Sequence, residues 1–89
     1  MSFAEIEMKV VRMFEEHVGI DPDYLPTESG VLLDNAEALD FHIDAGHKQE
    51  VIDEIGYITM SLINMCALLD VNLVDCLEAA YEKSVGVYE

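Results

Sequence analysis

The side chains best suited to chemistry are carboxylates that recur at helical spacing in the middle of the chain. Residues three or four positions apart share one face of a helix, so such carboxylates on two neighbouring helices face each other. Oxygen ligands of this kind are the ones that hard divalent cations prefer. The pattern therefore predicts a site for Mg²⁺, or for Mn²⁺, with the candidate ligands Asp34, Glu37, Glu50, Asp53 and Glu54.

A solvated acidic face on a bundle helix is the alternative interpretation of the same residues. Glu50 and Glu54 stand four positions apart, where like charges on a helix repel by roughly 0.2–0.5 kcal/mol. Lys48 is the one cation close to them in the sequence. Because this spacing is not optimised for stability alone, it favours a ligand-binding role, and both interpretations stay open.

Length and composition predict one domain, residues 1–89, in a chain that associates with copies of itself. A domain of this size buries only roughly 60–65% of the surface that its unfolded chain exposes. Yet 52% of its 89 residues are hydrophobic, which is high for a small soluble protein. Apolar surface that one chain cannot bury is commonly covered by another copy. We therefore expect a homodimer or a higher homo-oligomer.

The charge of the chain excludes one class of partner. The formal net charge is −15, and only four side chains are basic: Lys9, Arg12, Lys48 and Lys83. A protein that grips nucleic-acid phosphates needs clustered positive charge, so nucleic acid is not an expected partner. An anionic substrate such as a nucleotide would bind only with metal ions bridging the like charges.

Location follows from what the sequence lacks. It has no run of about 18 apolar residues and no basic stretch followed by an apolar one at its start, so neither a membrane span nor a signal peptide is expected. Cys66 and Cys76 lie among apolar neighbours, without the paired spacing of a zinc site. Free thiols are therefore expected in preference to a disulfide or a metal site. A cytoplasmic protein without a membrane partner fits these observations.

Apolar periodicity predicts an all-α fold with helices over about 2–18, 31–45, 47–69 and 73–83. Ser2 is a candidate N-cap, and Gly46 is expected to end the second helix. The stretch 21–30, with Pro22, Pro26 and Gly30, is expected to be a loop. The later turns of the third helix carry no polar stripe, so this helix should be central. Short connections between the helices favour an antiparallel four-helix bundle.

Two segments carry a resemblance to a family. The sequence DEIGYITMSLINMCALLDVNLVDCLEAAYEK, residues 53–83, resembles the second half of the MazG-like, all-α nucleoside triphosphate pyrophosphohydrolases. The shared features are an acidic helix start, a long apolar helix, a tight turn and a last helix ending in lysine. The sequence LDNAE, residues 33–37, stands where that family has its first acidic motif. The likeness covers about residues 31–83.

The resemblance implies a chemistry. Two acidic motifs would hold magnesium ions, which carry the triphosphate and activate a water, releasing pyrophosphate and a nucleoside monophosphate. Asp34 and Glu37 match the first motif. The second motif has two registers one helical turn apart, about 5.4 Å. One uses Glu50 and Asp53, and the other uses Glu54 with Tyr57 at the aspartate position.

The register with Tyr57 agrees better with the rest of the helix, and it implies a weakened enzyme. A tyrosine hydroxyl, with an ordinary pKa of about 10, is a poor magnesium ligand at neutral pH. On the last helix only Lys83 remains as a candidate phosphate contact, because Ala80, Ser84 and Val87 replace polar positions of the family. Tyr57 is either a residue at the edge of the core or one that stacks on a base.

Hydrolysis of nucleoside triphosphates is therefore expected to be weak or lost, while nucleotide binding survives. Nothing in the sequence indicates a nucleophilic side chain, because no serine or cysteine is paired with a histidine. A different class of function fits the composition as well. The chain could be a non-enzymatic acidic module that binds a basic partner protein or mimics the charge of nucleic acid.

Overall fold

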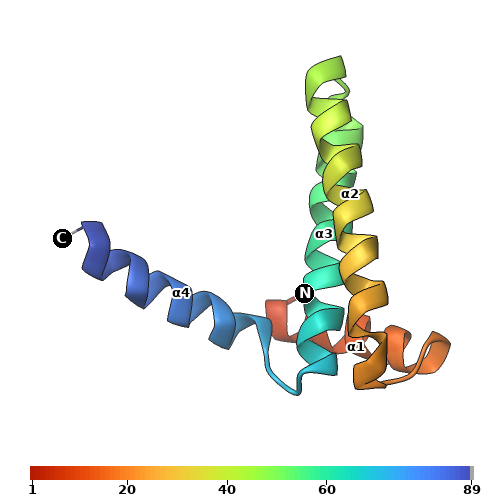
Figure 1. The fold of residues 1–89 in the computed structure, drawn as a ribbon, viewed down its shortest axis with the longest axis vertical. Helices are drawn as coiled ribbons and strands as arrows, with labels where there is room; N and C mark the ends of the chain where they lie inside the picture. The colour runs from red at the N-terminus through yellow and green to blue at the C-terminus, as the bar shows by residue number, and fades with distance from the viewer. Residues whose placement is uncertain (89) are drawn as a thin grey trace.

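The computed structural model describes residues 1–88, and every regular element in that range is helical (Figure 1). The elements are α1 (Phe3–His17), the short 3₁₀ helix η1 (Pro22–Tyr24), α2 (Leu25–Ala45), α3 (Lys48–Leu68) and α4 (Leu73–Tyr88). Helices α2 and α3 form a long antiparallel hairpin, α1 crosses its base, and α4 extends away from it. The predicted all-α class is confirmed.

The start of α2 differs from the prediction, because the helix begins at Leu25 and not near residue 31. The two prolines begin helices here instead of marking a loop. Pro22 opens η1, whose cap is Asp21 with its Oδ1 accepting from the Asp23 N–H at 3.0 Å. Pro26 lies in the first turn of α2, where a backbone N–H has no intrahelical acceptor and proline is tolerated.

The α2–α3 hairpin is held by a seam of side chains that alternate at three and four residues. On α2 the seam contains positions 25, 28, 32, 35, 39 and 42, and on α3 it contains 51, 54, 58, 61, 65 and 68; all of them are buried or half-buried. This spacing is that of antiparallel coiled coils. Gly46 closes the hairpin with φ 74°, in the left-handed region that favours glycine, and ends α2 as predicted.

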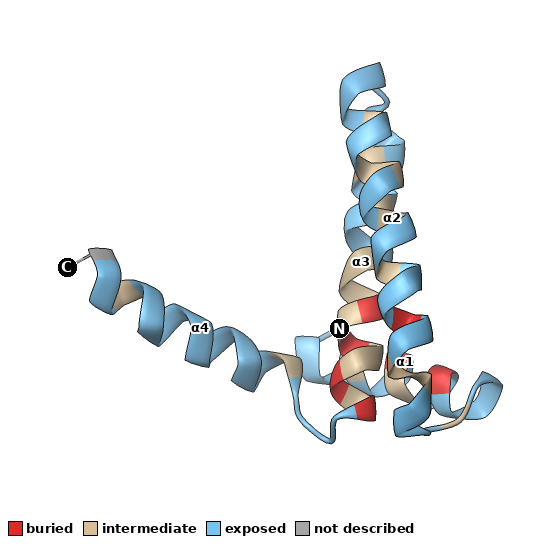
Figure 2. Ribbon diagram, viewed as in Figure 1, coloured by how far each residue is buried: buried red, intermediate tan, exposed pale blue. Residues whose placement is uncertain are grey.

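The apolar core lies where α1 crosses the lower part of α3. Its buried members are Val10, Phe14, Ile63, Cys66 and Leu68 (Figure 2). The Phe14 ring packs against Tyr24 of η1 with ring centroids 5.8 Å apart. Ser2 caps α1 as predicted, with its Oγ accepting from the Glu5 N–H at 3.2 Å. This small core anchors α1, but it leaves most of the apolar surface uncovered.

The four-helix bundle is realised only in part, because α1, α2 and α3 pack together while α4 contacts the others near its first turn (Figure 1). Leu77 and Tyr81 of α4 are 67% and 68% exposed. The later turns of α3 are central, since residues 58–68 are all buried or half-buried, whereas Ile52, Ile55 and Tyr57 in its first half are exposed. Periodicity identifies an apolar face, but it does not say which chain covers that face.

By length and composition, α3 is also apolar enough to cross a membrane. Central helices of soluble proteins meet the same criterion. Two polar side chains of α3, Ser61 and Asn64, are hydrogen-bonded to α2 in the hairpin.

Candidate functional site

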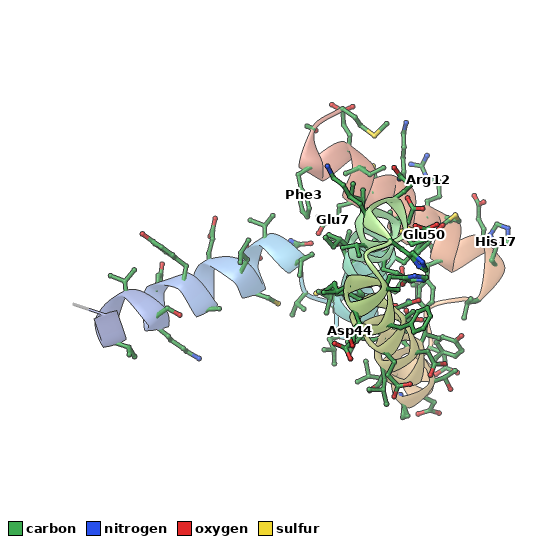
Figure 3. The ribbon with its side chains drawn as sticks, turned by 90° about the horizontal axis from the view of Figure 1, so that it is seen from above. Phe3, Glu7, Arg12, His17, Asp44 and Glu50 are labelled. Atoms are coloured by element: carbon green, nitrogen blue, oxygen red, sulfur yellow. The ribbon has the colours of Figure 1, made fainter. Side chains whose placement is uncertain are left out.

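The predicted metal ligands are spread along the hairpin. Asp34 and Glu37 are exposed on α2, Glu50 and Asp53 are exposed near the start of α3, and only Glu54 is half-buried. Figure 3 views the hairpin along its length and shows Glu50 near the closed end. Among residues 1–88 no three acidic, histidine or cysteine side chains gather as metal ligands would. A single chain does not assemble the predicted centre.

Two of these carboxylates differ in their surroundings. Asp53 accepts a hydrogen bond through Oδ1 from the Gln49 side-chain amide at 3.0 Å, one turn earlier on the exposed surface of α3. Glu54 instead belongs to the seam, and its Oε2 is buried without a hydrogen-bond partner. Asp53 therefore fits the solvated-face interpretation within one chain, whereas Glu54 presents an unsatisfied oxygen.

A carboxylate that was not among the predicted ligands lies deeper in the seam. Glu28 of α2 is 4% exposed. Its Oε1 accepts hydrogen bonds from Ser61 Oγ at 2.8 Å and from Asn64 Nδ2 at 3.4 Å, both on α3. We call Glu28, Ser61 and Asn64 the Glu28 cluster.

The negative charge of Glu28 is not balanced by a positive charge within the Glu28 cluster. Ser61 and Asn64 are neutral donors, and burying a carboxylate is costly unless a cation or several hydrogen bonds compensate it. Asn64 Oδ1 is also buried and has no hydrogen-bond partner. The neighbouring side chains of Glu28 and Asn64 therefore carry two kinds of oxygen that bind hard cations, a carboxylate and an amide carbonyl, and the amide oxygen has no hydrogen-bond partner.

Sequence reasoning missed the Glu28 cluster for two reasons. Assigning residues 21–30 to a loop removed Glu28 from any helix face. The later turns of α3 were predicted to carry no polar stripe, although Ser61 and Asn64 are three positions apart and hence on one face. The usable signal was the continuation of the α2 stripe backwards from Leu32 to Glu28 and Leu25 at the same spacing.

The two predicted substrate contacts lie apart from this cluster. Tyr57 is 53% exposed and lines a groove of about 540 Å³ between α1 and α3, together with Phe3 and Ile6. Lys83 lies on the part of α4 that extends away from the hairpin (Figure 1). Within one chain the structure therefore does not bring Lys83 to the acidic residues of α2 and α3.

Two of the three histidines lie in contact. His42 and His47 face each other across the hairpin turn with their Nδ1 atoms 3.1 Å apart, and Phe41 packs edge-on against both rings. In this contact one ring nitrogen must donate a hydrogen bond and the other must accept it. The hydrogen bond joins the two helices at the hairpin turn. The Nδ1 of His17 is 2.9 Å from the Met13 carbonyl oxygen of α1.

Comparisons with protein-family models, with curated proteins and with solved structures find no match to this chain.

Proposed function

We propose that the chain is a diverged, MazG-like relative of the nucleoside triphosphate pyrophosphohydrolases, which binds Mg²⁺ and a nucleoside triphosphate and hydrolyses it weakly or not at all. The observation that carries the proposal is Glu28, a carboxylate buried in the α2–α3 seam whose hydrogen-bond partners are both neutral. A bound cation would supply the missing positive charge. The resemblance of residues 31–83 to the family supplies the substrate class.

The Glu28 cluster suits magnesium better than a softer metal. Mg²⁺ takes oxygen ligands, keeps several waters, and is commonly held by one or two carboxylates together with substrate phosphates. Glu28 and the free Oδ1 of Asn64 offer oxygens of this kind. When bound, the ion would neutralise phosphate charge, which a chain with a net charge of −15 cannot otherwise accommodate. The exposed carboxylates would then serve to attract the cation.

The proposal includes a homodimer in the cytoplasm. Large hydrophobic side chains are exposed on all four helices, for example Met8, Leu33, Ile55 and Leu77. A second copy that covers these faces would also exclude water from the seam, which strengthens the interaction between a cation and a buried carboxylate. The two acidic hairpins would then contribute to one assembly.

Mg²⁺ or Mn²⁺ should stabilise the protein through Glu28. At about 100 times its dissociation constant a ligand adds roughly 2.7 kcal/mol to the free energy of unfolding. For a domain of this size that is a rise in Tm on the order of 10 °C, measurable by thermal melts followed by circular dichroism. Glu28→Gln, which keeps the shape of the side chain and removes its charge, should abolish the rise.

Asp44→Asn is the matched control, because it removes from the same helix one exposed carboxylate that is not a candidate ligand. The control should melt with the same metal response as the native chain. If Mg²⁺, Mn²⁺ and Ca²⁺ all leave the Tm of the native protein unchanged, the Glu28 cluster is a structural contact and the metal proposal fails.

Pyrophosphate release should be weak in the native chain. It is measured with each ordinary and deoxy nucleoside triphosphate in the presence of Mg²⁺, for the native chain and for Tyr57→Asp. A gain of activity in the variant would show that the tyrosine, which stands where the family places an aspartate ligand, is what silences the site. Strong native turnover would instead show that Glu50 and Asp53 form the second acidic motif.

A non-enzymatic acidic module is the second candidate, and the net charge of −15 favours it. Asp34, Glu37, Glu50 and Asp53 are all exposed, as a surface that meets a basic partner protein would require. Such binding weakens as salt screens the charges and needs no metal. Binding to a lysine-rich peptide that is unaffected by a chelator, together with melts that are insensitive to metal, would establish this function over the first.

A further inference from the structure

The junction between α3 and α4 is a defined turn. After α3 ends at Leu68, Asp70 takes φ 57°, and the Val71 N–H returns to the Cys66 carbonyl oxygen at 2.9 Å. A residue in the left-handed region followed by such a backward hydrogen bond is the common way to end a helix and turn the chain sharply. The turn therefore fixes where the first residues of α4 begin.

A second contact fixes the first turn of α4 from α1. Glu7 Oε2 accepts a hydrogen bond from the Leu73 N–H at 3.3 Å, which satisfies one of the free N–H groups at the start of α4. The carboxylate also lies at the end of the helix where negative charge is favourable. Two independent contacts, the turn and this cap, thus position Cys76 one turn into α4.

Cys76 meets Cys66 at this junction. The two Sγ atoms are 4.0 Å apart, and both residues are free cysteines. Cys66 is buried in the core, whereas Cys76 is exposed, and both line a groove of about 920 Å³ between α1, the end of α3 and the start of α4. A disulfide needs its sulfur atoms about 2.05 Å apart. Rotation of the side chains must therefore bring the two sulfur atoms about 2 Å closer together.

We propose that Cys66 and Cys76 form a redox modification site, which closes as a reversible intrachain disulfide with a small-molecule disulfide such as oxidised glutathione as the oxidant. The exposed Cys76 thiolate attacks the oxidant, forms a mixed disulfide and releases one thiol. The Cys66 thiolate then attacks the Cys76 sulfur and releases the second thiol. The two cysteines lose two electrons and two protons, and the oxidant is reduced to two thiols.

The surroundings of the two thiols set the order of these steps. Burial, which has the largest effect, together with the neighbouring Cys76 thiol and the Glu7 carboxylate raises the pKa of the Cys66 thiol to about 11. Only the thiolate is a nucleophile, so Cys66 reacts slowly at neutral pH. The mixed disulfide on Cys76 forms first, and ring closure should accelerate about tenfold per pH unit below pH 11.

The disulfide would act on the one helix that a single chain holds weakly. Beyond its first turn α4 extends away from the other helices (Figure 3). A covalent link between Cys66 and Cys76 would hold that first turn against α3 and so fix the direction in which the apolar side chains of α4 are presented. Oxidation would thus favour one orientation of α4 in its contact with a chain that covers it.

The experiment equilibrates the full chain with reduced and oxidised glutathione at several ratios, traps free thiols with an alkylating reagent, and analyses the intact mass and the peptides. The native chain should lose the mass of two hydrogen atoms, with Cys66 linked to Cys76 in one molecule. The variant Cys66→Ser should stop at the glutathione adduct on Cys76. Disulfides between molecules, or a native chain that keeps both thiols or stops at the adduct even at high pH, would overturn the proposal.

A second measurement does not depend on the folding of any variant. The closure rate of the native chain is followed between about pH 7 and pH 10, and repeated in a denaturant that removes the burial of Cys66. Folded chains should close more slowly at neutral pH and show the steeper dependence on pH at the alkaline end. Identical pH profiles in the two states would show that the fold does not organise the site.

Discussion

Replacing Ile63 by lysine is expected to unfold the protein. Ile63 is 3% exposed and lies in the core where α1 crosses α3, beside both grooves. A lysine there would be a buried charge without a partner, which costs several kcal/mol. Domains are stable by only about 5–15 kcal/mol, and one of this size should lie near the lower limit. Circular dichroism in a urea titration should show a lost or greatly lowered midpoint.

Ile55→Lys is the matched control for this prediction, because it makes the same chemical change on the same helix at an exposed position. The control should keep its helical signal. An Ile63→Lys protein with the urea midpoint of the native chain would show that the core around Ile63 does not hold α1 to α3.

The second large effect concerns association. Light scattering on the native protein should give at least twice the 10.0 kDa mass of one chain. The double variant Leu77→Glu, Tyr81→Glu should be monomeric. Each side chain is mostly exposed in one chain, and burying a large apolar side chain contributes about 2 kcal/mol. Losing both would weaken the association about a thousandfold per α4 that is covered.

A control on the same helix separates the loss of apolar surface from a general effect of charge. Glu78→Gln and Glu82→Gln change exposed charged residues of α4 and should leave the measured mass unaltered. A native chain that remains a well-behaved monomer at micromolar concentration would contradict the proposed homodimer, and the exposed faces of α4 would then have another partner.

Local rules predicted those parts of the fold that depend on local physics. The Ser2 cap, the end of α2 at Gly46 and the start of α4 near Leu73 follow from capping and turn preferences of a few adjacent residues. The start of α2 failed because the same proline that breaks a helix from inside is favourable in its first turn. Periodicity alone does not distinguish these two positions of Pro26.

The candidate site was harder to predict because its residues meet only across the hairpin. Glu28 and Ser61 are far apart in the sequence, and their contact depends on the register in which α2 and α3 pair. The meeting of His42 and His47 depends on the same pairing. The acidic residues predicted as metal ligands are mostly exposed. The number of carboxylates in a sequence does not show which of them faces inward. The direction in which α4 extends depends on its packing against other segments, and the sequence of α4 alone does not show these contacts.

The short turn at Gly46 has a consequence for how the chain folds. Bringing together two helices joined by so few residues costs little conformational entropy, and contacts between near neighbours in sequence form fastest. The α2–α3 hairpin is therefore expected to form early, with α1 adding the core around Ile63 afterwards. In the proposed homodimer, contacts of α4 with the second chain would form last, because their rate depends on protein concentration. Dilution would then delay completion of the dimer without delaying the first folding step.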